Sequence, residues 1–474
     1  MQSNESLTKQ IVQLQAEIRA LKESHSWRIT APLRWLRKPV VTSVANANPI
    51  AEDKPAPELE ISAPTDVKAY EERIATLRTD TFVLHGNSKA VRRIAYFAEN
   101  DCSSTYRYRA ANMAAVLNDA TLKVSDNQEL HASAACFYSA DLPEHAQQIA
   151  ECADILVISR ARYDENLAHL VHLFKEQHKR VLYDIDDLVF DVDEIDLIID
   201  TLGQAATDEV LNYWFSIVAR MGKALRMCDG AFTTNNFLAR KLQHFLPPTA
   251  SVHVVPNFIN QKQSETSQLF YQRKLDNMFA TNGRIKFGYF SGSATHNKDL
   301  ALMAPALVQL MLMNEQVDLL LVGHVDIALA FGSDFSKMVS NEWAHRVTLI
   351  PFTDYLTLQS LISEVDFNLV PLQSNDFTNC KSELKFFDAA AVGTPTLASP
   401  TFAYEHAITH TKTGYLVEDS AWLKELSNAA NFRINDVHGY ATMAQAAHAE
   451  VQQRYIWNTQ REAIFKALNI KPAT

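Results

Sequence analysis

The chain has 474 residues, 47% of them hydrophobic and 21% charged, which is enough apolar sequence for two or three globular domains. Only 12 residues are glycine, about a third of the usual share, which excludes collagen-like and glycine-rich low-complexity sequences. The formal net charge of −11 excludes a generally nucleic-acid-binding surface, because phosphate neutralisation requires an excess of Lys and Arg.

The five cysteines are scattered and form no CxxC pair, so we expect neither a disulfide framework nor a zinc site. This cysteine usage favours a reducing, cytoplasmic compartment. We find no apolar run of 18 residues and no signal-peptide pattern, so the sequence predicts no membrane span.

The first 25 residues are predicted to form a coiled-coil helix. Their apolar side chains recur at alternating spacings of four and three, which is the a/d pattern of a coiled coil. These side chains are Leu7, Ile11, Leu14, Ile18 and Leu21. The helix either self-associates or recruits a partner protein, or it packs as an amphipathic helix on its own protein.

Residues 26–40 form a basic amphipathic segment, and residues 41–66, rich in Ala and Pro, are predicted to be a linker. The stretch 26–38 carries two tryptophans and four basic residues without an acid. This combination suits the headgroup region of an anionic membrane. The alternative is a basic helix that covers a neighbouring domain.

From residue 67 onward, short apolar strands alternate with amphipathic helices, which is typical of parallel sheets covered on both faces. The first predicted strands are 93–98, 135–138, 155–159, 181–185, 231–234 and 252–255. After a mostly polar interruption at 259–283, further strands are predicted at 285–290, 317–322, 347–350, 367–370 and 396–398. The helices between them are predicted at 107–117, 165–177, 212–227, 300–313 and 356–362.

The sequence therefore predicts an α/β protein with two Rossmann-like, doubly wound domains that face a cleft, preceded by a helical extension. The first domain is expected over 67–265 and the second over 266–450. A tail helix over 451–474 is expected to return to the first domain.

Ligands of doubly wound sheets bind at the carboxyl ends of strands. One such place is the loop 288–298, where Ser291, Gly292 and Ser293 lie between a strand and a helix N-terminus. Backbone N–H groups in such a loop can cradle a phosphate or diphosphate. The alternative is a plain strand–helix turn.

A second candidate is the segment 379–395, in which Lys381, Lys385 and Asp388 are spaced to share one helical face. Two cations and a carboxylate can bind a diphosphate and a ribose. A solvated surface helix is the alternative, but Phe386 and Phe387 indicate a largely buried helix, where idle charges are disfavoured.

At this point the sequence resembles the retaining GT-B glycosyltransferases of the family-4-like group. The stretch 388–399 (DAAAVGTPTLAS) is similar to their donor-site signature. Segments similar to their other motifs follow in the expected order at 254–257, 288–300, 365–371 and 414–417. The N-terminal helix with residues 26–34 resembles an extension of bacterial surface-polysaccharide transferases, and the whole resemblance covers roughly residues 90–460.

The resemblance implies that the second domain holds a UDP-, GDP- or dTDP-sugar donor and needs no cofactor or metal. Asp388 matches the acid that bonds the ribose hydroxyls, and Lys385 and Lys381 would offset the diphosphate charge. The loop residues Ser291, Gly292 and Ser293 would donate hydrogen bonds to that diphosphate.

The sequence departs from the family in two places, of which one is the absence of the Arg that many relatives place beside the Lys at the phosphates. Cys380 stands where a sugar-binding Glu is expected, and we expect Asn379 or Glu383 to take over that role, with Ser382 beside them. His296 is predicted to bond a donor phosphate or sugar hydroxyl, the alternative being a helix-capping or core histidine.

In the first domain, a strand ends in three neighbouring carboxylates, Asp184, Asp186 and Asp187. Three carboxylates this close together cost free energy unless they are hydrogen-bonded, paired or functional. We expect an acceptor-side or cleft-structural role for them. Asp186, Asp187 and His296 are the candidates for catalysis, although the resemblance implies that the leaving phosphate helps to deprotonate the acceptor. A metal-dependent GT-A-type transferase, using Asp184 and Asp186 to hold Mn²⁺ or Mg²⁺, is the alternative.

The segment that follows the first strand is predicted to reach the cleft, where family-4-like enzymes bring donor and acceptor together. Its candidate residues are Ser104, Arg107 and Arg109. For the two arginines, an ordinary helix start is the alternative.

We therefore predict a retaining, hexosyltransferase-like enzyme. It would extend a growing or lipid-linked bacterial surface glycan of the O-antigen or capsule type, at the cytoplasmic face of the inner membrane. The alternative function is a non-catalytic GT-B-like scaffold in a glycan-assembly complex, for which Cys380 is the main support.

Overall fold

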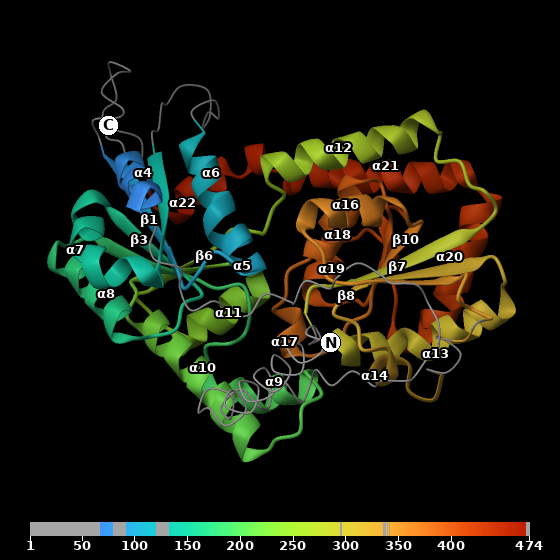
Figure 1. Ribbon diagram of the computed structural model, residues 1–474, viewed down its shortest axis with the longest axis horizontal. Coiled ribbons are helices and arrows are strands. Elements are labelled where there is room, and N and C mark those ends of the chain that lie inside the picture. The colour runs from blue at the N-terminus through green and yellow to red at the C-terminus, as the bar shows by residue number, and fades with distance from the viewer. Residues whose placement is uncertain are drawn as a thin grey trace, which may run out of the picture. The chain divides into compact units, whose positions relative to one another are not determined.

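The structure is a computed structural model that describes residues 67–78, 92–119, 132–293, 296–334, 338, 340 and 342–470. The predicted coiled-coil helix, basic segment and linker, residues 1–66, lie outside the described residues. From Ser62 onward the chain forms one compact unit. Within this unit Figure 1 shows two sheets, each flanked by its own helices.

The first sheet has six parallel strands in the order β2-β1-β3-β4-β5-β6. They are β1 (Arg92–Ala98), β2 (Ala132–Tyr138), β3 (Ile155–Ser159), β4 (Arg180–Asp184), β5 (Gly230–Thr233) and β6 (Ser251–Val254). All five residues of β3 are buried, because helices cover both faces of the sheet. The strand order changes direction between β1 and β3, so the carboxyl ends of these strands flank a switch point.

The helices of this sheet connect its strands in chain order. They are α4 (Val67–Leu77), α5 (Ser104–Tyr106), the π-helical turn η3 (Arg107–Ala111), α6 (Asn112–Asn118), α7 (Leu142–Cys152), α8 (Glu165–Glu176), α9 (Ile195–Thr201), α10 (Asp208–Arg226) and α11 (Asn236–Phe245). The helix predicted at 107–117 therefore begins with a π-helical turn, a feature that is frequent at functional sites.

The second sheet also has six parallel strands, in the order β12-β11-β10-β7-β8-β9. They are β7 (Ile285–Ser291), β8 (Val317–Gly323), β9 (Val347–Ile350), β10 (Phe367–Val370), β11 (Thr396–Ala398) and β12 (Gly414–Leu416). Here the order reverses between β7 and β10, which places a second switch point at their carboxyl ends. The predicted doubly wound architecture with two sheets is confirmed.

The helices of the second sheet follow the same alternation. They are α12 (Gln261–Asp276), α13 (Asn297–Met313), α14 (Ile327–Phe331), α16 (Tyr355–Ser363), α17 (Asp376–Asn379), α18 (Leu384–Ala391), α19 (Phe402–Ala407), α20 (Trp422–Asn435) and α21 (Val437–Arg454). None of the helices in the described part of the chain is long and apolar enough to cross a membrane.

Two elements differ from the prediction. The polar stretch 259–283 contains α12, which packs on α16 and α18 through one narrow face that includes Ser267 and Tyr271. A helix with so narrow a buried face shows little hydrophobic periodicity. Strand β12 has only three residues, too few for an alternation to be recognised.

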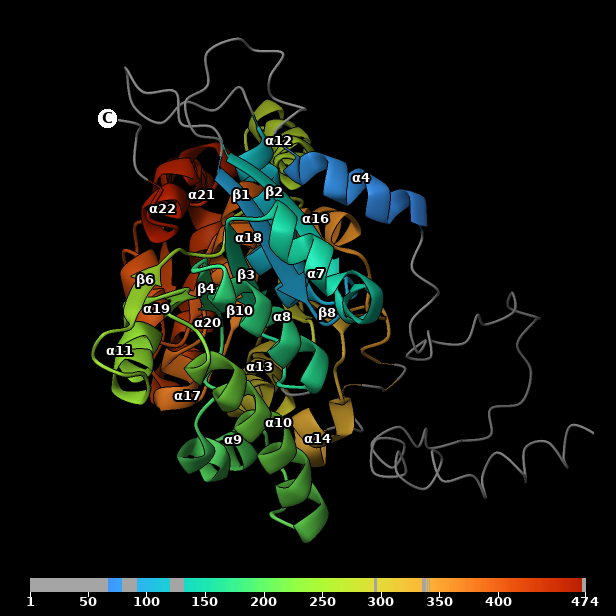
Figure 2. The same cartoon turned by 90° about the vertical axis from the view of Figure 1, so that its left-hand side faces the viewer.

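The last described helix, α22 (Arg461–Ala467), packs against the first sheet, although the helices before it cover the second. Ile464 and Phe465 are buried in the same hydrophobic cluster as Ile94 and Tyr96 of β1. In Figure 2 this red helix lies beside the blue β1. The tail therefore links the two sheets a second time.

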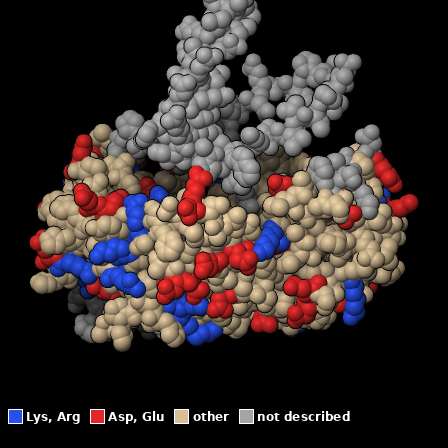
Figure 3. Space-filling model, turned by 90° about the horizontal axis from the view of Figure 1, so that it is seen from below, with Lys and Arg blue, Asp and Glu red and all other residues tan. Residues whose placement is uncertain are grey.

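Acidic and basic side chains are interspersed over the described residues of the face drawn in Figure 3. Such mixing of both signs is typical of a solvated surface.

Candidate active site

A cavity of about 720 Å³ lies where the carboxyl ends of strands from both sheets meet. Ser291 at the end of β7, Gly323 at the end of β8 and Val370 at the end of β10 line it from the second sheet. Arg160, directly after β3, lines it from the first. Both switch points therefore contribute to one cavity, as ligand sites of doubly wound folds do.

Most of the predicted site residues line this cavity. They are Ser104, Arg107, Asp186, Asp187, Ser291, Gly292, Ser293, His296, Lys381, Ser382, Lys385 and Asp388. Four predicted residues, Arg109, Asp184, Asn379 and Glu383, do not.

Two lysines present their ammonium groups to the cavity. Lys385, in the first turn of α18, has its Nζ 5.1 Å from the ring centroid of Tyr289. Burial lowers its pKa to about 8, although the charge of Asp299 opposes the shift. The Nζ of Lys381 lies 3.6 Å from a carboxylate oxygen of Asp187. Two cations in one enclosed site favour a ligand with several negative charges, such as a diphosphate.

The loop from Ser291 to Ser293 faces the same space from the N-terminus of α13. A Cβ added at Gly292 would meet no atom within 4 Å, so the backbone is open to the cavity there. At Gly323 an added Cβ would clash with the carbonyl oxygen of Ser291, so only glycine lets β8 end this close to the loop. The N–H groups and dipole of a helix N-terminus attract anions, so this side of the cavity also suits the anionic part of a ligand.

His296 is neutral and oriented by its neighbours. Burial, helped by the charge of Lys385, lowers its pKa to about 4. Its Nδ1 lies 2.9 Å from Oδ2 of Asp299, and Oδ1 of that carboxylate accepts hydrogen bonds from the backbone N and Nε2 of Gln373 at 3.2 and 3.0 Å. Because Asp299 accepts from Nδ1, Nε2 of the ring is left as an acceptor, which suits a hydroxyl donor.

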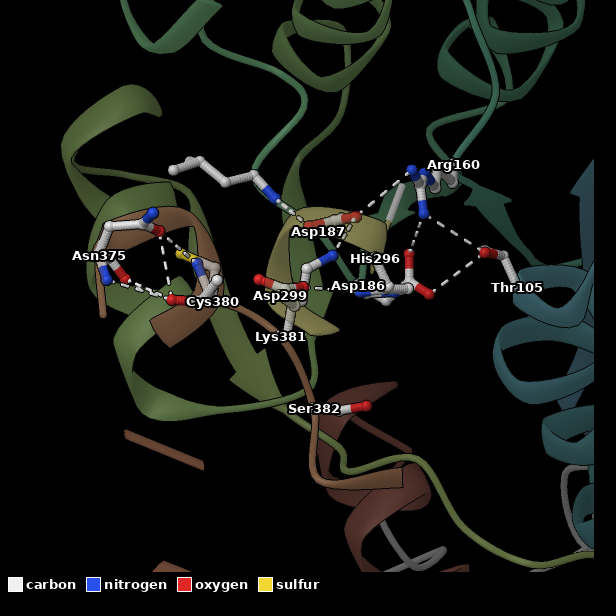
Figure 4. Close-up of polar contacts among 12 residues, drawn as sticks. Thr105, Arg160, Asp186, Asp187, His296, Asp299, Asn375, Cys380, Lys381 and Ser382 are labelled. Atoms are coloured by element: carbon white, nitrogen blue, oxygen red, sulfur yellow. Dashed lines mark hydrogen bonds and ion pairs between the residues drawn. The ribbon is translucent and has the colours of Figure 1, made fainter. Parts of the chain in front are cut away.

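Asp186 and Asp187 are paired with cations (Figure 4). Nη1 of Arg160 donates to Oδ1 of Asp186 at 3.0 Å, and Nη2 of Arg160 lies 3.6 Å from Oδ2 of Asp187. Thr105 donates to Oδ2 of Asp186 at 3.3 Å. Arg160 has a φ of 43°, unusual for a non-glycine residue and a form of strain that clusters at active sites. Arg160 was not predicted as a site residue, although its position directly after the predicted strand 155–159 could have indicated it.

Asp388 lies at the other side of the cavity, among residues of both domains. Gln263 donates to its Oδ1 at 2.7 Å and the Tyr108 hydroxyl to its Oδ2 at 3.3 Å. Burial raises its pKa to about 6. The guanidinium of Arg107 lies 4.0 and 4.4 Å from the ring centroids of Tyr108 and Tyr355. Neither Gln263 nor Tyr108 had a local signal in the sequence.

The prediction that Arg109 and Asp184 lie at the cleft is wrong. Both side chains are fully buried, with Nε of Arg109 2.7 Å from Oδ1 of Asp184. Nη1 of Arg109 donates to the Val255 carbonyl and to Asn257. Burial raises the pKa of Asp184 to about 6, against the opposing charge of Arg109. The pair joins η3 to the carboxyl ends of β4 and β6 inside the domain.

The proposed substitutes for the missing sugar-binding Glu are also wrong. Oδ1 of Asn379 accepts from the backbone N of Phe402 at 2.8 Å, and Glu383 is buried beside Tyr455. Cys380 is fully buried with Phe377 in the hydrophobic cluster of the first domain. The chain between α17 and α18 therefore inserts Cys380 into that core, where it cannot contact a ligand.

The alternative of a GT-A metal site at Asp184 and Asp186 is wrong as well. Strand β4 ends at Asp184, so Asp184 points into the core while Asp186 points into the cavity. The described residues contain no group of three His, Cys, Asp or Glu side chains suited to a metal ion. Two separate parallel sheets also differ from the GT-A fold.

Comparison with known proteins agrees with this geometry. Residues 286–436, the greater part of the second domain, match the family model of glycosyl transferases group 1. No curated protein matches the sequence. Among solved structures, HepE from Anabaena in complex with UDP and glucose is similar with a TM-score of 0.50 at 14% identity, over 80% of this chain and 99% of its own. A glycosyltransferase from Rickettsia africae is similar with a TM-score of 0.51 at 13% identity, over 81% of this chain and 100% of its own.

These findings confirm two predictions. The fold is GT-B, with two Rossmann-like domains around a shared cavity. The family match over the second domain supports the enzyme class, a glycosyltransferase.

Proposed function

We propose that this protein is a retaining glycosyltransferase that moves a sugar from a nucleotide-sugar donor to a growing or lipid-linked bacterial surface glycan. The observation that carries the proposal is the pair of Lys381 and Lys385 opposite the Ser291–Ser293 loop, in a cavity shared by both domains. This arrangement meets the main demand of the reaction, which is to stabilise a departing nucleotide diphosphate.

The cavity offers a place for each part of such a donor. The diphosphate binds between Lys381, Lys385 and the N–H groups at the start of α13. The ribose hydroxyls bond Asp388, whose carboxylate is already held by Gln263 and Tyr108. The sugar hydroxyls donate to Nε2 of His296, a neutral acceptor beside the lysines.

In the proposed reaction the bond between the anomeric carbon of the sugar and the diphosphate breaks. The acceptor hydroxyl attacks this carbon on the face from which the diphosphate departs. The electron pair passes to the phosphate oxygen, which takes the proton of the acceptor. The two lysines stabilise the negative charge that develops on the diphosphate. His296 is a poor general base at neutral pH, because its pKa is about 4.

The nucleotide is best tested with UDP-sugars first, because HepE, similar in fold, was determined with UDP. We expect one member of a panel of UDP-, GDP- and dTDP-sugars to raise the melting temperature and to be hydrolysed slowly without an acceptor. With an acceptor, the anomeric signals in proton NMR are expected to show retention. The proposal fails if no donor shifts the melting temperature and none is hydrolysed.

Donor affinity is expected to fall as the pH rises through about 8. Burial lowers the pKa of Lys385 to about 8, so above this pH the free protein loses the charge that binds the diphosphate. Bound diphosphate favours the charged lysine, so affinity should drop about tenfold per pH unit above 8. Titration calorimetry between pH 7 and 9.5 measures this dependence.

The matched control is Lys385→Arg, which keeps its charge throughout this range and is expected to bind with little pH dependence. An equally flat profile for the unchanged protein would contradict the role given to Lys385.

We also propose that the enzyme works at the cytoplasmic face of the membrane, held there by residues 26–38. No disulfide joins the five cysteines, all of which lie in the described part of the chain, and this supports a reducing compartment. The full chain is expected to float with vesicles that contain phosphatidylserine, and a variant without residues 1–40 to stay in solution. A full chain that does not float would overturn the membrane contact, and light scattering of the same variants tests whether the predicted coiled coil self-associates.

The alternative of a non-catalytic scaffold has lost its main support. Cys380 lies in the core of the first domain, while Lys381, Lys385 and Asp388 line the cavity.

A further inference from the structure

One wall of the cavity is apolar and has no part in the donor site described above. It consists of Val189, Leu202 and Trp214 from the first domain and Phe377 from the second, called the apolar wall below. All four belong to the first domain's hydrophobic cluster or pack against it. These four side chains therefore connect the lining of the cavity to that core.

Trp214 is held in a fixed orientation on α10. Its Nε1 donates to Oε1 of Gln204 at 2.7 Å, so the polar edge of the indole is satisfied within the protein. The Tyr213 ring meets Trp214 edge to face, with centroids 5.4 Å apart and an interplanar angle of 84°. Both ribbon views show α9 and α10 together at the lower end of the first domain (Figures 1 and 2). Trp214 lines the cavity and its N–H is already bonded within the protein, so the apolar part of the indole is what it can present to a ligand there.

The apolar wall begins where the proposed diphosphate site ends. The Nζ of Lys381 lies 4.4 Å from the ring centroid of Phe377, so this ring adjoins the cation directly. The backbone N of Val189 donates to the carbonyl of Asp187, whose side chain lies 3.6 Å from the same Lys381 Nζ. The apolar wall therefore adjoins the proposed diphosphate site, so a second substrate bound on it lies beside the donor.

We propose that the apolar wall is the acceptor subsite and that Trp214 stacks against the C–H face of an acceptor pyranose. This inference rests on the proposed function and names the class of its second substrate, a glycoside. A pyranose has an apolar face and a hydroxyl rim, and polar groups for that rim, Thr105 and Asp186, line the same cavity. A lipid chain would instead require apolar walls on every side.

Saturation-transfer NMR on the UDP-saturated full chain tests the proposal. The probes are methyl α- and β-pyranosides of glucose, galactose, mannose and N-acetylglucosamine. At least one is expected to receive saturation on its axial ring protons. With Trp214→Ala its dissociation constant should rise about tenfold, while the affinity for UDP stays within twofold. Trp214→Phe should retain most of the binding.

The matched control is Phe215→Ala, the next residue of α10, which is 47% exposed and does not line the cavity. It should bind the pyranoside as the unchanged protein does. If Trp214→Ala loses its fold, the smaller change Leu202→Ala is measured instead. Its pyranoside dissociation constant is also expected to rise about tenfold, with the affinity for UDP within twofold.

The inference is overturned if no pyranoside binds the UDP-loaded protein, or if binding is unchanged in Trp214→Ala. Failure of UDP, GDP and dTDP alike to bind would instead contradict the proposed function, and if only GDP or dTDP binds, that nucleotide replaces UDP in the experiment. The two failures are therefore separated by one set of titrations.

Discussion

Lys385→Ala is expected to abolish measurable donor binding without harming the fold. The ammonium of Lys385 lies in an enclosed site, where removing one partner of a charged contact typically weakens binding by about 100-fold or more. Burial has already lowered the pKa of this lysine to about 8. The charged form of Lys385 therefore reduces the stability of the folded protein when no donor is bound. The melting temperature should therefore stay the same or rise. Calorimetry with UDP and a thermal melt measure both effects.

The matched control is Lys424→Ala, a lysine of the same domain whose side chain is 77% exposed. It should leave both donor affinity and melting temperature unchanged. Normal donor binding by Lys385→Ala would place the diphosphate elsewhere, whereas a large drop in its melting temperature would give Lys385 a structural role.

Arg109→Leu is expected to destabilise the protein by about 3–5 kcal/mol, because it leaves the carboxylate of Asp184 buried without its ion-pair partner. Both side chains of the pair are inaccessible to solvent, with Nε and Oδ1 2.7 Å apart. Arg109 also loses its bonds to the Val255 carbonyl and to Asn257. Urea denaturation followed by circular dichroism measures the change in the free energy of unfolding.

Two further variants distinguish the effect of losing the ion pair from the effect of losing side-chain volume on the free energy of unfolding. The double variant Arg109→Leu with Asp184→Leu should recover much of the stability, because no unpaired charge remains. Lys68→Met removes an exposed partner of Glu72 and should change stability by no more than about 1 kcal/mol. Equal losses for the single and double variants would show that packing, not charge, makes the Arg109 site sensitive.

The geometry also explains how a transferase site tolerates Cys380. In the family that the sequence resembles, a Glu is expected there to contact the sugar. In this protein the segment from Phe377 to Cys380 packs into the core of the first domain, and the neutral His296 faces the cavity beside the lysines. His296, at the start of α13, therefore offers a neutral acceptor to the cavity where the expected Glu is absent.

The amino-acid sequence alone was sufficient to predict the two doubly wound sheets and most of the predicted site residues that line the cavity. Strands of a parallel sheet are buried on both faces, so they appear as apolar runs that local sequence reveals, as in 155–159. The loop after 285–290 is likewise a local feature, from which Ser291 was predicted, whereas Lys385 and Asp388 were predicted from their spacing on one helical face and from the family resemblance. The polar helix α12 and the short strand β12 were missed because each lacks a clear periodic pattern.

Only the tertiary structure decided which polar side chains reach the cavity and which remain in the core. Asp184 and Asp186 are two residues apart, yet Asp184 is paired with Arg109 inside the domain and Asp186 lines the cavity. The partners that hold the site are remote in the chain, as when Gln263 donates to Asp388 from 125 residues away. Burial and pairing depend on such distant neighbours, and no local pattern of residue types records them.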